Sequence, residues 1–190
     1  MKKFRSILLA SAFAMALSSV EATTVIPPSF DQLVRQAELI FQGTVTEVHA
    51  QWVGEGGQRH IESYITFSVE EAVKGKPGQT YTLRMFGGVV GDQGMAISDA
   101  PKFAVGDRDI LFVENNGTQI IPLVGIMYGR FHVKRDETGG EVVTQNEGQP
   151  VKNVARLGRE MDSAADEAVA PTLTATAFKA AIRSKLEESR

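Results

Sequence analysis

The chain of 190 residues contains no cysteine. This absence excludes disulfides, thiolate metal ligands, a thiol nucleophile and a lipid attached to a cysteine. The hydrophobic core therefore has to supply the stability of the fold without a covalent cross-link. A chain of this size forms one domain and can bury on the order of 70% of the surface that it exposes when unfolded.

Histidine is also scarce, since only His49, His60 and His132 occur. A metal site needs several ligands that converge on one point. In the register described below, His49 and His60 point to opposite faces of a hairpin. We therefore expect histidines on the surface or rim, and neither a metal site nor a cofactor.

The chain lacks the sequence motifs of common catalytic sites. It has no GxSxG, no HExxH and no calcium-loop spacing of aspartates. The glycine-rich residues 87–94 lack the P-loop and GxGxxG spacings that hold phosphates. The neighbouring Glu70 and Glu71 point to opposite faces of a strand, so they cannot act on one bond. We expect no catalytic residues, although a hydrolase site of unrecognised type could still assemble from distant residues.

The amino-terminal residues resemble an export signal. A basic start with Lys2, Lys3 and Arg5 precedes an apolar run over residues 7–17, which is too short to cross a bilayer. A small-residue pattern ends at Ala22. Residues 1–22 are therefore predicted to be a signal peptide, and the mature protein to be periplasmic or secreted.

The charge balance narrows the possible partners. The whole chain has a formal charge of −3, and removing the signal, which carries +2, leaves about −5. A nucleic-acid partner would favour a basic surface, so we expect none. The same balance gives no attraction to anionic lipid, so we expect no membrane association after signal cleavage.

Residues 39–73 predict two long strands joined by a glycine-rich turn at residues 54–58. Both strands alternate between apolar and polar residues, as half-buried strands do. Matching the apolar faces sets Val45 opposite Phe67 and Gly43 opposite Val69. The same register places Trp52 beside His60. Four side chains are expected to fill the interior of the sheet: Phe41, Val45, Ile65 and Phe67.

Further strands are predicted at residues 80–86, 109–114 and 126–134, with 119–123 continuing the second of these and 141–145 pairing with the last. Short antiparallel strands, glycine bends and no βαβ rhythm favour a mainly β fold. We expect a five-stranded OB-type antiparallel barrel, with a short amino-terminal helix capped by Ser29 and a carboxy-terminal helix. The predicted units are the signal peptide, a barrel domain at 23–145, a polar linker at 146–171 and an amphipathic helix at 172–190.

The order of these segments resembles the netrin-like domain, the OB-fold module of the tissue inhibitors of metalloproteases. The resemblance covers residues 23–124 and is carried by AELIFQGTV, VEEAVKGKPG and VGDRDILFV, in that order. It implies an OB fold that binds a protease. In those inhibitors the amino-terminal cysteine chelates the protease zinc. The matching position in this chain is Thr23.

These observations predict an exported, non-catalytic binding module whose partner is a protein, with an extracellular protease as one possibility. The contact surface is expected to combine three parts: the lead at Thr23, Thr24 and Val25, the hairpin tip at Trp52 and His60, and a glycine-rich loop with Gly87, Gly88 and Met95. Trp52 could equally pack beneath the loop. The alternative function is a carrier that holds a small ligand in the mouth of the barrel.

Overall fold

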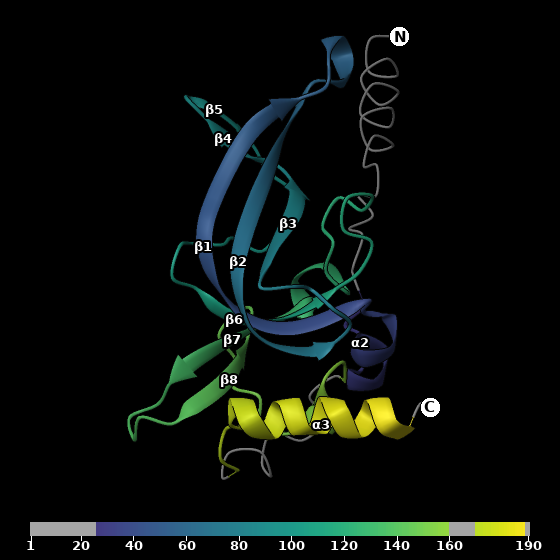
Figure 1. Ribbon diagram of the computed structural model, residues 1–190, viewed down its shortest axis with the longest axis vertical. Helices are drawn as coiled ribbons and strands as arrows, with labels where there is room; N and C mark the ends of the chain where they lie inside the picture. Colours follow the sequence, from purple (N-terminus) through teal and green to yellow (C-terminus); the bar gives the residue numbers. More distant parts are fainter. Residues whose placement is uncertain (1–25, 160–169, 189–190) are drawn as a thin grey trace, which may run out of the picture.

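The computed structural model describes residues 26–159 and 170–188, which form a mainly β antiparallel protein (Figure 1). A six-stranded open sheet has the order β3-β2-β1-β6-β7-β8, and β4 and β5 form a small separate hairpin. The strands are β1 (Leu39–Val53), β2 (His60–Lys74), β3 (Thr80–Phe86), β4 (Gly88–Val90), β5 (Gln93–Met95), β6 (Arg108–Val113), β7 (Arg130–Arg135) and β8 (Glu141–Gln145). The helices are α2 (Phe30–Gln36), α3 (Ala175–Glu188) and three short 3-10 turns, η1 (Gly56–Gln58), η2 (Ile126–Gly129) and η3 (Val154–Arg156).

The long hairpin β1-β2 is present, and its register is confirmed at Val45–Phe67 and Gly43–Val69. Beyond Val45 the predicted register is wrong, because the pairing shifts by one residue at Thr46. Such a β-bulge adds one residue to one strand and bends it. Trp52 is therefore opposite Ile61 and not opposite His60.

A glycine inside a strand predicts a bend or a close approach of two backbones, and Gly43 provides the close approach. A Cβ atom at this position would lie 2.7 Å from the Ser68 carbonyl oxygen. At the far end of the hairpin, in contrast, a Cβ atom on Gly56 or Gly57 would meet nothing within 4 Å. The two glycines of the tip therefore have open space around them, whereas the glycine of the strand is sterically required.

The six-stranded sheet is open and does not close into the expected five-stranded barrel. Residues 114–123 cross the open side of the sheet, and one bridge joins Val113 and Leu123. The Phe86 amide at the edge of β3 donates to the Ile120 carbonyl over 2.9 Å. The segment predicted to continue a strand thus covers the gap as a loop.

The predicted strand at 126–134 begins later than expected. Residues 126–129 form η2, and only Arg130–Arg135 pair as β7. Gly125 and Ile126 both have a φ of 63°, which is incompatible with an extended strand. The pairing of residues 141–145 with this strand is confirmed, because β8 is hydrogen-bonded to β7.

Two apolar clusters lie on opposite faces of the sheet, and β1 and β6 contribute to both. Ile40 and Phe112 face the helix-side core, whereas Phe41 and Leu111 face the pocket-side core. This follows from the alternation of side chains along a strand. The four residues expected to fill the interior all belong to the pocket-side core: Phe41, Val45, Ile65 and Phe67.

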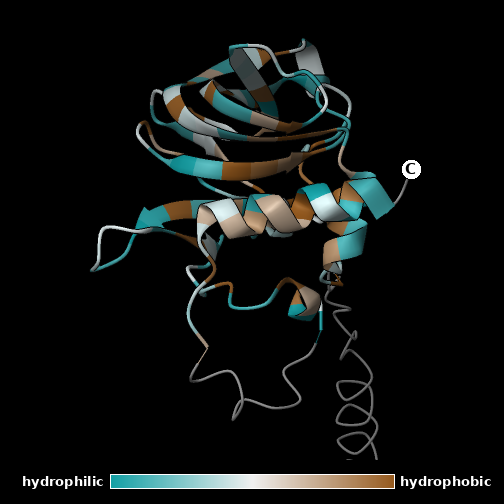
Figure 2. Cartoon of the chain, turned by 60° about the horizontal axis from the view of Figure 1, so that its bottom comes forward, coloured by the Kyte–Doolittle hydropathy of each residue, from teal (hydrophilic) through white to brown (hydrophobic). Residues whose placement is uncertain are grey.

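The helix-side core is covered by the two helices (Figure 2). The capping box at Ser29 and Gln32 that was predicted for α2 is confirmed. The carboxy-terminal helix docks on the sheet, since Phe178 and Ile182 of α3 are fully buried. The helical spacing of residues 174–188 predicts Lys179 on the face opposite the apolar stripe, but its ammonium group is buried and donates to Gln42 and Glu71.

The predicted signal peptide lies outside the described residues. Part of the predicted linker is described, and Val151 and Leu157 from it are buried in the helix-side core. This burial was not apparent from its polar composition. Neither described helix is long and apolar enough to span a membrane.

Candidate functional site

The predicted contact residues do not all meet at one place. Thr23, Thr24 and Val25 lie outside the described residues. Trp52 is half-buried near the end of β1, with the Arg59 guanidinium 4.5 Å from the centre of its ring. His60 lies on the other face of the hairpin, because its neighbour Ile61 is the residue opposite Trp52.

His60 belongs to a polar cluster on the face of the sheet opposite Trp52. Its ring stacks on Phe86 with the centroids 5.2 Å apart, and its nitrogens contact the Gln58 carbonyl and the Glu62 carboxylate. These two hydrogen bonds raise the pKa of His60 above 6.5. Burial alone would raise the pKa of Glu62, but hydrogen bonds from Tyr64 and His60 lower it below its ordinary value.

The bulge also corrects the expected position of His49. His49 is opposite Tyr64, so it lies on the same face as His60 and not on the opposite one. The described residues nevertheless include no group of three or more histidine, aspartate or glutamate side chains that could hold a metal ion.

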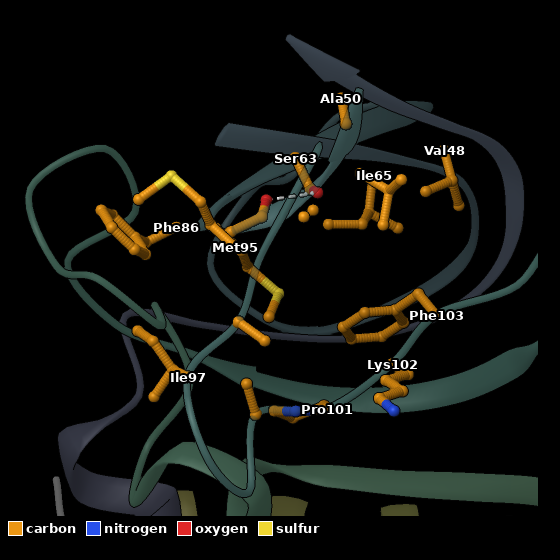
Figure 3. A pocket seen from close by; sticks show the side chains of 17 residues that line it. Val48, Ala50, Ser63, Ile65, Phe86, Met95, Ile97, Pro101, Lys102 and Phe103 are labelled. Carbon is orange, nitrogen blue, oxygen red and sulfur yellow. Dashed lines mark hydrogen bonds between the residues drawn. The ribbon is translucent and has the colours of Figure 1, made fainter. Parts of the chain in front are cut away.

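A pocket of about 580 Å³ lies on the face of the hairpin that carries Trp52. Figure 3 shows strand side chains such as Ser63 on one side and the loop residues Pro101 and Phe103 on the other. Pockets of a few hundred to a thousand Å³ are typical of small-molecule sites. The walls come from three strands, the β4-β5 hairpin and the loop that follows: Val48, Ala50, Ser63, Ile65, Met85, Phe86, Gly87, Gly88, Val89, Gly94, Met95, Ala96, Ile97, Ala100, Pro101, Lys102 and Phe103.

Three of the predicted contact residues build one wall of this pocket. The Gly87 amide donates to the Ile61 carbonyl over 2.7 Å, and the Ser63 hydroxyl donates to the Gly87 carbonyl over the same distance. Met95 closes the wall, with its sulfur 3.2 Å from the Ile61 amide. Gly88 is required here, because a Cβ atom would lie 2.4 Å from the Ser63 hydroxyl.

The opposite wall is held by Arg130, which is only 2% exposed. Its guanidinium donates to the Lys102 carbonyl over 2.6 Å and lies 3.9 Å from the centre of the Phe103 ring. The same group donates to Asp109, which is fully buried, and to Asp107. One buried cation thus connects the interior of the sheet to the loop that lines the pocket.

The lining is chemically simple. Apart from backbone groups, its polar side chains are the Ser63 hydroxyl and the Lys102 amine, and these lining residues include no carboxylate or imidazole. The Ser63 hydroxyl already donates to Gly87, so no base activates it. Such a surface can hold an apolar group, and it offers few groups for acid–base chemistry.

Sequence reasoning indicated residues of both walls but missed the arginine that holds the second one. The sequence predicts that Met95, Ile97 and Phe103 either fold the long loop over one end of the barrel or form an exposed apolar surface, and all three line the pocket. Arg130 was predicted only as one polar residue of an alternating strand, and nothing in that pattern distinguishes a buried arginine from an exposed one. The position of Asp107 just before a strand predicts a role in the turn, and the Asp107 carboxylate does accept from the Ala104 amide over 2.8 Å.

No protein-family model matches the chain, and no curated protein sequence is significantly similar to it.

Proposed function

We propose that this chain is an exported, non-catalytic binding module whose pocket receives an apolar group. The observation that carries the proposal is the pocket of about 580 Å³, with a lining in which Ser63 and Lys102 are the polar side chains. A preformed apolar cavity with few polar groups is the usual form of a binding site. The absence of a carboxylate or an imidazole from these lining residues supports binding over hydrolysis.

The apolar group belongs either to a small molecule or to a side chain of a protein partner. The netrin-like order of segments favours a protein, and an extracellular protease is the partner class that it implies. The strongly curved β1-β2 hairpin and the loop crossing the open side also support a partly open OB-type barrel (Figure 1). In this proposal the lead at Thr23, Thr24 and Val25 and the indole of Trp52 are further contacts for the partner.

Filling the pocket tests the proposal. Ala100→Phe places an aromatic ring in the cavity from a loop, with little disturbance of the sheet. We expect the purified mature protein to bind an anilinonaphthalene sulfonate dye saturably, and the variant to lose this binding. Ala180→Phe is the matched control, because Ala180 is exposed on α3, away from the pocket.

Mass spectrometry of the same preparations under native conditions identifies any ligand that purifies with the protein. A small apolar ligand that is present in the wild type and absent from Ala100→Phe would assign the pocket to a carrier function. Equal dye binding by the wild type and the filled variant would refute the pocket as a binding site.

A further inference from the structure

The outer edge of β1 changes its partner along the strand. Its first part, through Thr44, pairs with β6. The Val45 amide then donates to the Asp107 carbonyl over 2.8 Å, and the Val45 carbonyl accepts from the Gly106 amide over 2.9 Å. After the bulge, no described strand pairs with this edge, although β1 continues to Val53.

The residues whose backbone groups point outward at this edge can be assigned. The amide and carbonyl of Ile61 are bound on the far side of β2, by Met95 and Gly87 respectively. Two residues that are directly opposite in an antiparallel pair either exchange both of their backbone hydrogen bonds or exchange none. Trp52, which is opposite Ile61, therefore directs its amide and carbonyl away from β2. The alternation places Ala50 and Val48 in the same orientation.

This open edge lies at the mouth of the pocket. Val48 and Ala50 supply the β1 part of the lining, and in Figure 3 Val48 and Phe103 lie on the same side of the cavity. Two of the lining residues are also large exposed apolar side chains, since Val48 is 41% and Val89 is 68% exposed. Exposed apolar side chains around a cavity are typical of a surface that a partner covers.

We propose that the partner contributes an extended peptide segment that pairs with β1 at Val48, Ala50 and Trp52. This inference rests on the proposed function and names the partner class for the same pocket. Strand addition satisfies the outward amides and carbonyls, and it brings every second side chain of the peptide over the pocket. Apolar residues are favoured at those positions.

The remaining side chains of the peptide lie beside the polar face of β1, which presents Glu47, His49 and Gln51. A lysine or arginine next to Glu47 adds an opposite-charge cross-strand pair. The recognised chemistry is thus an extended segment that alternates between apolar and polar residues, with one basic residue among the polar positions.

The test uses a synthetic pool of heptapeptides that alternate apolar and polar residues, incubated with the immobilised mature protein. Bound peptides are identified by mass spectrometry, and the tightest is titrated against the protein in solution. Hydrogen exchange, followed residue by residue, is measured before and after saturation. We expect the amides of Val48, Ala50 and Trp52 to exchange rapidly in the free protein and to become protected with peptide bound.

Val48→Pro removes one outward amide, and proline is tolerated at a strand edge where the amide faces solvent. Loss of one hydrogen bond corresponds to peptide binding about tenfold weaker. Ile120→Thr changes an exposed apolar side chain outside the pocket lining and keeps every amide of β1, so it serves as the control and is expected to bind within about twofold of the wild type. Circular dichroism verifies that both variants are folded.

The possible outcomes distinguish the strand-addition proposal from the pocket proposal. Peptide binding with protection of the three amides supports strand addition. Dye binding without any peptide binding, or peptide binding without edge protection, refutes strand addition and leaves the pocket proposal standing. If the three amides become protected without peptide as the protein concentration rises, the edge pairs with a second copy of the chain, and the proposal is refuted. If the mature protein binds neither the dye nor any peptide, both proposals are refuted.

Discussion

Arg130 is buried, and its guanidinium is shared by Asp107, Asp109, the Lys102 carbonyl and the face of the Phe103 ring. A buried cation is costly to remove from water unless its partners compensate, and here every partner is within contact distance. The arginine therefore does more than neutralise Asp109. It fixes the loop that forms one wall of the pocket.

Replacing Arg130 with methionine should lower the free energy of unfolding by about 3–5 kcal/mol, because the buried Asp109 would lose the guanidinium that offsets its charge and would retain the His132 ring. Chemical denaturation of the mature protein measures the change. Arg135→Met, on the exposed end of the same strand, is the control and should change stability by no more than about 0.5 kcal/mol. Equal losses in the two variants would contradict the role given to Arg130.

His60 gives the protein a predictable pH dependence. Its folded pKa lies above 6.5 because the Gln58 carbonyl and the Glu62 carboxylate favour the charged ring. The resulting stabilisation is fully present below the unfolded pKa and is lost as the pH rises through the folded pKa.

A titration of the His60 ring by NMR should have its midpoint above 6.5, and Glu62→Gln should move that midpoint down. Glu47→Gln removes a carboxylate from the same strand pair without touching His60, and it should leave the midpoint in place. A midpoint that does not respond to Glu62→Gln would show that this carboxylate does not act on the ring.

Among single residues, those with a steric role were the most predictable from sequence. Gly43 was identified as a close approach because glycine is unfavourable inside a strand without such a reason. The roles of Arg130 and Lys179 were not predictable, since both fall at polar positions of a regular pattern. Their burial depends on what packs over them from distant parts of the chain.

At the scale of elements, α3 is joined to the sheet by a cluster of aromatic rings. The Phe178 ring lies 4.8 Å from that of Phe131 and 5.9 Å from that of Phe30, centroid to centroid. Lys179 adds polar contacts to Gln42 and Glu71 at the side of this cluster. The helix is therefore part of the core and not a mobile arm.

Truncation of Phe178 to alanine should lower the free energy of unfolding by about 3–5 kcal/mol, the usual cost of removing a buried phenylalanine side chain. The helix itself should be retained, since alanine favours it. Thr176→Ala, at an exposed position of the same helix, is the control for thermal unfolding. A loss below about 1 kcal/mol for Phe178→Ala would mean that α3 contributes little to the core.

Strand positions followed well from the alternation of residues, and β3 was predicted with its observed ends. The bulge at Thr46 did not follow, because one extra residue leaves no mark on composition. That residue decides which side chains of β1 face the pocket. With regular alternation Glu47 and His49 would face inward, whereas the shift turns Val48 and Ala50 toward the cavity.

For the whole molecule, the two cores share strands. Neighbouring residues of β1 and of β6 face opposite clusters, so neither core can come apart without disturbing the other. This arrangement favours a single cooperative unfolding transition. Whether the sheet closes into a barrel could not be predicted, because closure depends on how residues 114–123 cross the open side.

Unfolding followed by Trp52 fluorescence and by far-ultraviolet circular dichroism should give one shared midpoint. Trp52 reports on the distal end of the hairpin, whereas circular dichroism reports on all strands and helices. An earlier loss of the fluorescence signal would show that the distal hairpin and its pocket open before the rest of the sheet.

The open tip of the long hairpin has a practical consequence. Gly57 has open space around it, and the chain contains no cysteine. A Gly57→Cys variant would carry a single thiol, so a maleimide fluorophore would attach at one known point. The fluorescence of that label would then report a partner that reaches the distal end of the hairpin, without a label on the partner.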